Sequence, residues 1–139
     1  MIKKLSIAAV VLTSGCHLEK PYVYPLDIFI KDNAPCFAVP ADRQKKGDLV
    51  LNRGVIISRL TGGKWVNIWH SDPQPPFTII PAGQCVSYPE INWQPGDYSV
   101  LMTIASERDD EKFRLVNTIR LQKNRAGYFS LQNIQQLHD

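Results

Sequence analysis

Several signatures of enzymes and cofactor-binding proteins are missing from this chain of 139 residues. It has only three histidines and three cysteines. None of them forms the HExxH, HxxxH or CxxC spacing of metal and redox sites, and neither the GxSxG turn of hydrolases nor a GxxxxGKS/T phosphate loop occurs. The sequence therefore predicts a non-enzymatic protein without a metal, a cofactor or a small-molecule substrate.

The chain also lacks long helical and long apolar stretches. No segment of about 12 residues keeps helical periodicity, and no apolar run reaches the roughly 20 residues that span a bilayer. Charge of one sign is not in large excess, since 16 lysines and arginines stand against 13 aspartates and glutamates. These values are typical of one compact globular domain.

The first sixteen residues do not belong to that domain. Lys3 and Lys4 precede the short apolar run at residues 5–13, which is the pattern of a secretory signal peptide. The run at residues 12–16, which ends in Ser14, Gly15 and Cys16, resembles the lipobox of bacterial lipoproteins. In those proteins the cysteine is diacylated and becomes the mature N-terminus. The alternative is an ordinary secretory leader in which Cys16 has no special role.

The lipobox resemblance divides the chain into three parts. Residues 1–15 are the expected signal peptide, residues 16–24 a lipidated tether and residues 25–139 a single domain. The residue after the cysteine is His17 rather than the aspartate that retains lipoproteins at the inner membrane. The resemblance thus implies attachment to the periplasmic side of the outer membrane.

Removal of the leader changes the charge and cysteine balance. The mature chain has 14 basic and 13 acidic residues, so the basic stripe of a nucleic-acid-binding protein is not expected. Cys36 and Cys85 remain as an even pair in an oxidising compartment, which predicts a disulfide. Two unpaired buried thiols are the alternative.

Short alternating segments separated by turn residues predict an all-β fold. A Gly62–Gly63 turn gives the strongest hairpin signal, whereas the proline-rich residues 71–81 are expected to form a loop or an irregular edge. The pattern favours an antiparallel, immunoglobulin-like β-sandwich of seven or eight strands, with a small β-barrel as the alternative. The expected strands are residues 26–31, 35–39, 49–60, 64–70, a short segment at Cys85, 98–106, 112–121 and 128–132.

One turn motif supports the sandwich. The sequence Pro95, Gly96, Asp97, Tyr98 resembles the tyrosine corner that precedes a late strand in immunoglobulin-like domains. The cysteine pair departs from the immunoglobulin pattern, because Cys85 precedes that tyrosine instead of following it.

Aromatic residues provide candidates for partner recognition. Trp65 and Trp69 share one face of an expected strand, where tryptophans of a sandwich usually belong to the core. Trp93 and Tyr88 lie in proline-flanked loops and are predicted partner contacts. Tryptophan and tyrosine each often contribute about 2 kcal/mol or more at protein interfaces.

The turn at residues 107–111 is a second candidate contact. It carries Glu107, Asp109, Asp110 and Glu111. An acidic turn is commonly a solvated loop tip, and a protruding one also has the charge to enter a basic cleft of a partner.

One histidine lies beside groups that hydrolases use. His70 is followed by Ser71 and Asp72, but adjacent residues on a strand point to opposite faces and do not converge as a catalytic triad requires. A loop histidine at a strand end is the simpler interpretation.

The lipobox, the single cysteine pair, the segment 47–70 with Trp65 and Trp69, and the turn before Tyr98 together resemble a family of small enterobacterial lipoproteins described as type VI secretion immunity proteins. The resemblance covers most of the chain. It implies a periplasmic antidote that binds and blocks a toxic effector, such as a lipase or a peptidoglycan-cleaving enzyme. The alternative function is an envelope structural or secretion-assembly lipoprotein that binds another envelope protein through an exposed strand edge.

Overall fold

A computed structural model describes residues 23–44, 47–72, 74–108 and 111–134. The expected signal peptide, Cys16 and most of the expected tether lie outside these ranges. The described residues form ten β-strands and one short 3-10 turn, Ala41–Arg43, and contain no α-helix. The predicted all-β class is confirmed.

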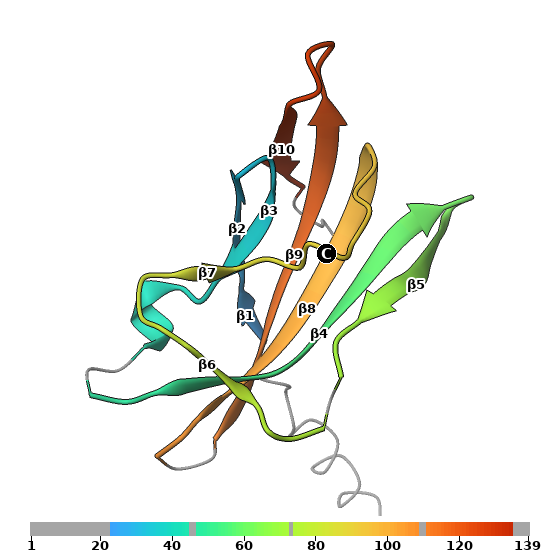
Figure 1. Cartoon of the computed structure of the whole chain (residues 1–139). Helices are drawn as coiled ribbons and strands as arrows, with labels where there is room; N and C mark the ends of the chain where they lie inside the picture. The colour runs from blue at the N-terminus through green and yellow to red at the C-terminus, as the bar shows by residue number, and fades with distance from the viewer. Residues whose placement is uncertain (1–22, 45–46, 73, 109–110, 135–139) are drawn as a thin grey trace, which may run out of the picture.

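Seven of the strands form one large twisted sheet (Figure 1). Its main path is β1-β9-β8-β4-β5, β10 pairs with the end of β9, and β6 pairs with the start of β4. The strands are β1 (Val23–Pro25), β4 (Val50–Thr61), β5 (Lys64–His70), β6 (Thr78–Ile80), β8 (Gly96–Ser106), β9 (Lys112–Lys123) and β10 (Phe129–Asn133).

The remaining strands form a small sheet in the order β2-β3-β7. They are β2 (Asp27–Lys31), β3 (Ala34–Ala38) and β7 (Cys85–Val86). The two sheets stay separate and both have open ends, so the structure is a sandwich and the β-barrel alternative is wrong.

Two of the ten strands occupy segments where none was expected. β1 contains two residues of the expected tether, Val23 and Tyr24, and pairs with β9 in parallel, the one exception to the antiparallel pattern. β6 lies inside the proline-rich segment that was expected to be a loop or an irregular edge, and it pairs with the start of β4. Each has only three residues and depends on a neighbouring long strand, so neither carries an alternating pattern of its own.

The core forms where the alternating faces of the long strands meet the small sheet. On β8, Tyr98, Val100, Met102 and Ile104 are buried and point inward. Their register partners include Ile119 and Leu115 of β9 and Val55 and Ile57 of β4, all fully buried. From the opposite sheet and its connections come Leu26, Ile28, Phe37, Val39, Ile91 and Trp93.

Glycines occupy the positions in β4 and in the turn after it where the backbone has a positive φ. Gly54 has a φ of +139° and lies at a register shift between β4 and β8, as in a β-bulge. Its amide donates to Asn52 Oδ1 at 3.0 Å. Gly62 and Gly63, with φ values of +59° and +81°, close the predicted β4–β5 hairpin.

The predicted tyrosine corner is present at the start of β8. The Tyr98 hydroxyl donates to the Gln94 carbonyl oxygen at 2.7 Å and accepts from the Gln94 amide at 3.1 Å. These bonds let a fully buried phenol keep its hydroxyl satisfied, and they fix the loop before β8 onto the core.

The predicted disulfide joins Cys36 of β3 to Cys85 of β7, so the alternative of two free thiols is wrong. The bond links residues 49 positions apart and ties the two-residue strand β7 to the small sheet. On the chain-entropy model, closing a loop of this length stabilises the fold by about 4 kcal/mol.

Replacement of both cysteines by alanine is therefore expected to lower the free energy of unfolding by about 4 kcal/mol. Urea denaturation of the double variant, followed by tryptophan fluorescence, measures the loss. The wild-type chain under reducing conditions is the matched control and should show a similar decrease. A decrease below about 1 kcal/mol in both would contradict a structural role for the bond.

Candidate functional site

The described residues show no grouping of side chains that is typical of a metal site. Across residues 23–44, 47–72, 74–108 and 111–134, no three histidine, cysteine or acidic side chains come together as metal ligands would. The same ranges hold no helix that is long and apolar enough to cross a bilayer.

Trp93 is not at the surface, contrary to the prediction of a partner contact. Its side chain is only 7% exposed, and its ring packs edge-on against Tyr98 at 4.9 Å and Phe37 at 6.4 Å between centroids. The loop between β7 and β8 folds back onto the core and carries this indole inward. The indole N–H has no hydrogen-bond partner among the described residues.

Tyr88 connects the same loop to β4 and β5. Its ring lies 4.6 Å from that of Trp69 and 6.0 Å from that of Phe37, and Asn52 Nδ2 donates to its hydroxyl at 2.9 Å. Burial raises the pKa of Tyr88, the charge of Glu90 adds to the rise, and the bond from Asn52 opposes it. Tyr88 is therefore a neutral, half-buried packing residue.

The described residues of the acidic turn are exposed, and a backbone hydrogen bond joins the turn to the sheet. Glu107 and Glu111 are exposed, whereas Asp109 and Asp110 lie outside the described residues. The Glu107 amide donates to the Leu49 carbonyl at 2.9 Å, which fixes the turn to the start of β4. The hydroxyl of Ser106 donates to Asp48 at 2.5 Å and lowers the pKa of that carboxyl.

The β4–β5 hairpin exposes the largest set of apolar side chains on neighbouring strands. β5 is the last strand of the large sheet, and all of its residues except Trp69 are exposed. In Figure 1 the hairpin extends away from β2 and β3, which do not cover it. Ile56, Leu60, Trp65, Val66 and Ile68 are each 38% to 46% exposed.

Both faces of this hairpin are apolar. Trp65 pairs with Leu60 on the outer face of the sheet. Val66 pairs with Arg59, which pairs in turn with the buried Tyr98 on the inner face.

The expectation that strand tryptophans belong to the core is thus wrong for Trp65, which is 43% exposed. The prediction that Trp65 and Trp69 share one face is also wrong. The register shift between Ile57 and Ser58 leaves Trp69 opposite the buried Ile57 on the inner face, whereas Trp65 lies on the outer face.

His70, Ser71 and Asp72 have separate structural roles. The Ser71 hydroxyl oxygen accepts from the Val55 amide at 2.8 Å, and Asp72 accepts from the Gln74 amide at 3.0 Å. His70 Nδ1 lies 3.2 Å from the Ser71 carbonyl oxygen. This is the arrangement of a strand end and a turn, in which the imidazole does not contact the hydroxyl.

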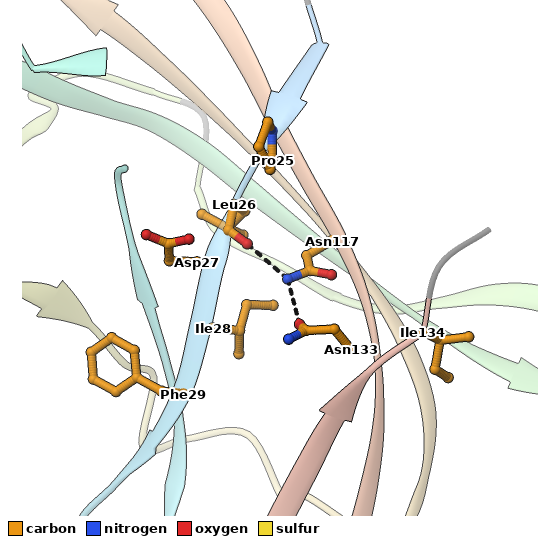
Figure 2. A pocket seen from close by; sticks show the side chains of 8 residues that line it. All are labelled: Pro25, Leu26, Asp27, Ile28, Phe29, Asn117, Asn133 and Ile134. Atoms are coloured by element: carbon orange, nitrogen blue, oxygen red, sulfur yellow. Dashed lines mark hydrogen bonds between the residues drawn. The ribbon is translucent and has the colours of Figure 1, made fainter. Parts of the chain in front are cut away.

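A groove of about 510 Å³ lies where the chain crosses from the large sheet to the small one (Figure 2). Asn117 Nδ2 donates to the Leu26 carbonyl and to Asn133 Oδ1, both at 2.8 Å. The Asn117 side chain thereby supplies a hydrogen-bond donor to the Leu26 carbonyl oxygen at the point where the chain passes between the two sheets. The sequence analysis did not single out this pair, and its only signal was an asparagine between the buried Leu115 and Ile119 of β9.

Fold and surface define a disulfide-linked β-sandwich with an uncovered apolar hairpin at one edge. The chain belongs to the family described as a domain of unknown function, DUF7480, whose model matches residues 23–133. No curated protein and no solved structure matches the chain significantly.

The different burial of two tryptophans gives a stability test. Trp93→Ala removes a buried indole and should lower the free energy of unfolding by about 3–5 kcal/mol. Trp65→Ala, which loses mainly a cross-strand contact to Leu60, should cost about 1 kcal/mol or less. Urea denaturation measures both variants. Equal losses would contradict the burial described for these two side chains.

Proposed function

We propose that this protein is a lipid-anchored immunity protein on the periplasmic side of the outer membrane, which binds and blocks a toxic type VI secretion effector. The observation that carries the proposal is the β4–β5 hairpin, whose apolar side chains are exposed on both faces of an edge strand. Contiguous exposed apolar surface is typical of protein-binding sites, and tryptophan is enriched among the residues that dominate binding energy.

The distance between the hairpin tip and the expected lipid anchor supports the hairpin as the binding surface. Val23 lies in one row across the large sheet with Arg114, Thr103 and Gly54. The hairpin tip at Thr61 is seven residues farther along β4, a separation of about 23 Å. Only six residues separate Val23 from Cys16. An acylated Cys16 would therefore hold the opposite end of the sheet near the membrane and leave the tip facing the periplasm.

The same geometry makes the acidic turn the weaker candidate. The turn containing Glu107 and Glu111 follows β8 at the end of the sheet where β1 begins (Figure 1). In an anchored protein this end faces the membrane, so an effector would reach the hairpin first. We therefore assign partner binding to the hairpin rather than to the turn.

The exposed edge also favours the second candidate, an envelope structural or secretion-assembly lipoprotein. Assembly proteins commonly add a strand of one subunit to the sheet of another. The two functions differ in the partner and not in the surface that binds it. A toxin gene directly beside the gene for this chain favours immunity, whereas a cluster of assembly genes favours the second function.

Membrane attachment is tested through Cys16. Because acyl chains on this residue supply the anchor, Cys16→Ala is expected to move the protein from the membrane fraction to the soluble periplasm. Fractionation and immunoblotting measure the distribution, with His17→Ala as the control that keeps the cysteine. A Cys16→Ala protein that stays with the membranes would contradict lipid anchoring.

Immunity is tested by co-production with the product of a neighbouring toxin gene directed to the periplasm. The wild-type chain should restore growth, and Trp65→Ala should weaken effector binding about 30-fold, as expected for an interface tryptophan. Phe29→Ala is the matched control, because Phe29 has the same exposed fraction of 43% but lies on the other sheet. Unrelieved toxicity in the presence of the wild-type chain would overturn the proposal.

A further inference from the structure

We infer that β5 binds an extended, acidic segment of the partner, which adds to the large sheet as one more strand. This inference rests on the proposed function and specifies the chemistry of the partner at the same hairpin. It follows from three properties of the hairpin, namely its open backbone edge, its charge and the placement of its apolar side chains.

The open edge determines the shape of the partner segment. The order of the large sheet ends at β5, and within the described part of the chain no strand pairs with the outer side of Lys64–His70. A strand pairs its backbone on both sides, so an edge of seven residues offers a hydrogen-bonding ladder about 23 Å long. Only an extended segment matches that ladder along its length.

Most of the usual protections of an edge strand are absent from β5. Proline, charged side chains along the strand and a covering helix or loop keep natural edges from pairing. β5 contains no proline, and its only lysine, arginine, aspartate or glutamate is Lys64 at its first position. One protection is present, since the register shift against β4 between Ile57 and Ser58 is a β-bulge that leaves Ile68 without a register partner. An edge left open in this way is suited to pairing with another chain.

The charge of the hairpin determines the charge of the partner. Residues 49–71 contain three basic residues and none of the 13 acidic residues of the chain. Arg59 donates to the Pro95 carbonyl oxygen at 2.7 Å, so its partner in this contact is a neutral group and not a carboxylate. The acidic residue of the adjoining strand, Asp97, is already bound by Arg120 through contacts of 2.9 and 3.2 Å. The local field is therefore positive, and it attracts carboxylates.

Lys64 is the basic residue best placed for direct contact. It is exposed at the start of β5, next to the exposed Trp65. No carboxylate of the described residues forms an ion pair with it. A carboxylate on an added strand would lie beside its ammonium group, while the alternate side chains of that strand would pack on Trp65 on one face and Val66 on the other.

A second copy of this chain fits the edge less well. In a two-fold β5–β5 pairing each hairpin would meet an identical hairpin, which has three basic residues and no carboxylate to pair with Lys64. The positive fields of the two hairpins would oppose this association. An acidic strand from a different protein avoids this repulsion.

The test uses the full chain and synthetic nine-residue peptides in place of the effector. One peptide alternates valine with glutamate, and its control alternates valine with lysine. Hydrogen exchange read by mass spectrometry should show slower exchange of the backbone amides of residues 64–70 with the glutamate peptide only. Binding should weaken as salt is raised, because the attraction between the charges is screened.

Matched charge reversals locate the contact. Lys64→Glu should weaken binding of the glutamate peptide about five-fold or more. Lys31→Glu should leave it unchanged, because Lys31 is an exposed lysine at the end of β2 on the other sheet. Equal weakening by both variants would show a general charge effect and overturn the inference.

Other outcomes also decide the matter. Equal binding of the lysine peptide, no binding of either peptide, or slowed exchange at a segment other than β5 would overturn the inference. A free chain that sediments as a dimer with β5 already protected would show that a second copy covers the edge, which also overturns it.

The inference and the proposed function fail in different ways. If the wild-type chain relieves effector toxicity but the effector leaves β5 exchange unchanged, the partner binds elsewhere and only the inference is wrong. If the wild-type chain gives no relief, the proposed immunity function itself is wrong.

Discussion

The small sheet is too narrow to cover the large one, and the surface properties of the molecule follow from that mismatch. Three strands, of which β3 and β7 are joined by the Cys36–Cys85 bond, bury the inner face of β8, β9 and part of β4. These strands do not cover the β4–β5 hairpin, so side chains on both faces of β5 are exposed to solvent. Apolar residues that would elsewhere form a core are exposed there.

The two ends of the large sheet carry side chains of different charge and polarity. One end carries β1 and the acidic turn after β8, and under the proposed lipidation it lies toward the membrane. The other end carries an apolar, basic hairpin without any acidic residue. Under the proposed function, a single sheet thereby separates the membrane-attached end from the partner-binding end by the length of its strands.

Local features of the fold could be predicted from the sequence, whereas the exposed surface could not. Alternation gave the long strands, and residue type gave the hairpin turn, the disulfide and the tyrosine corner. The exposure of Trp65 and the burial of Trp93 depend on which distant segments cover them. The parallel pairing of β1 and the Asn117–Asn133 contact likewise join segments whose own patterns carry no sign of the partner.

The central claim is that the β4–β5 hairpin, and not the acidic turn, contacts the partner. Site-specific photocrosslinking in the periplasm, with the crosslinker placed at position 65 or at position 107, compares the two surfaces directly. We expect the effector to be captured from position 65 and not from position 107. Capture from position 107 alone would contradict this account.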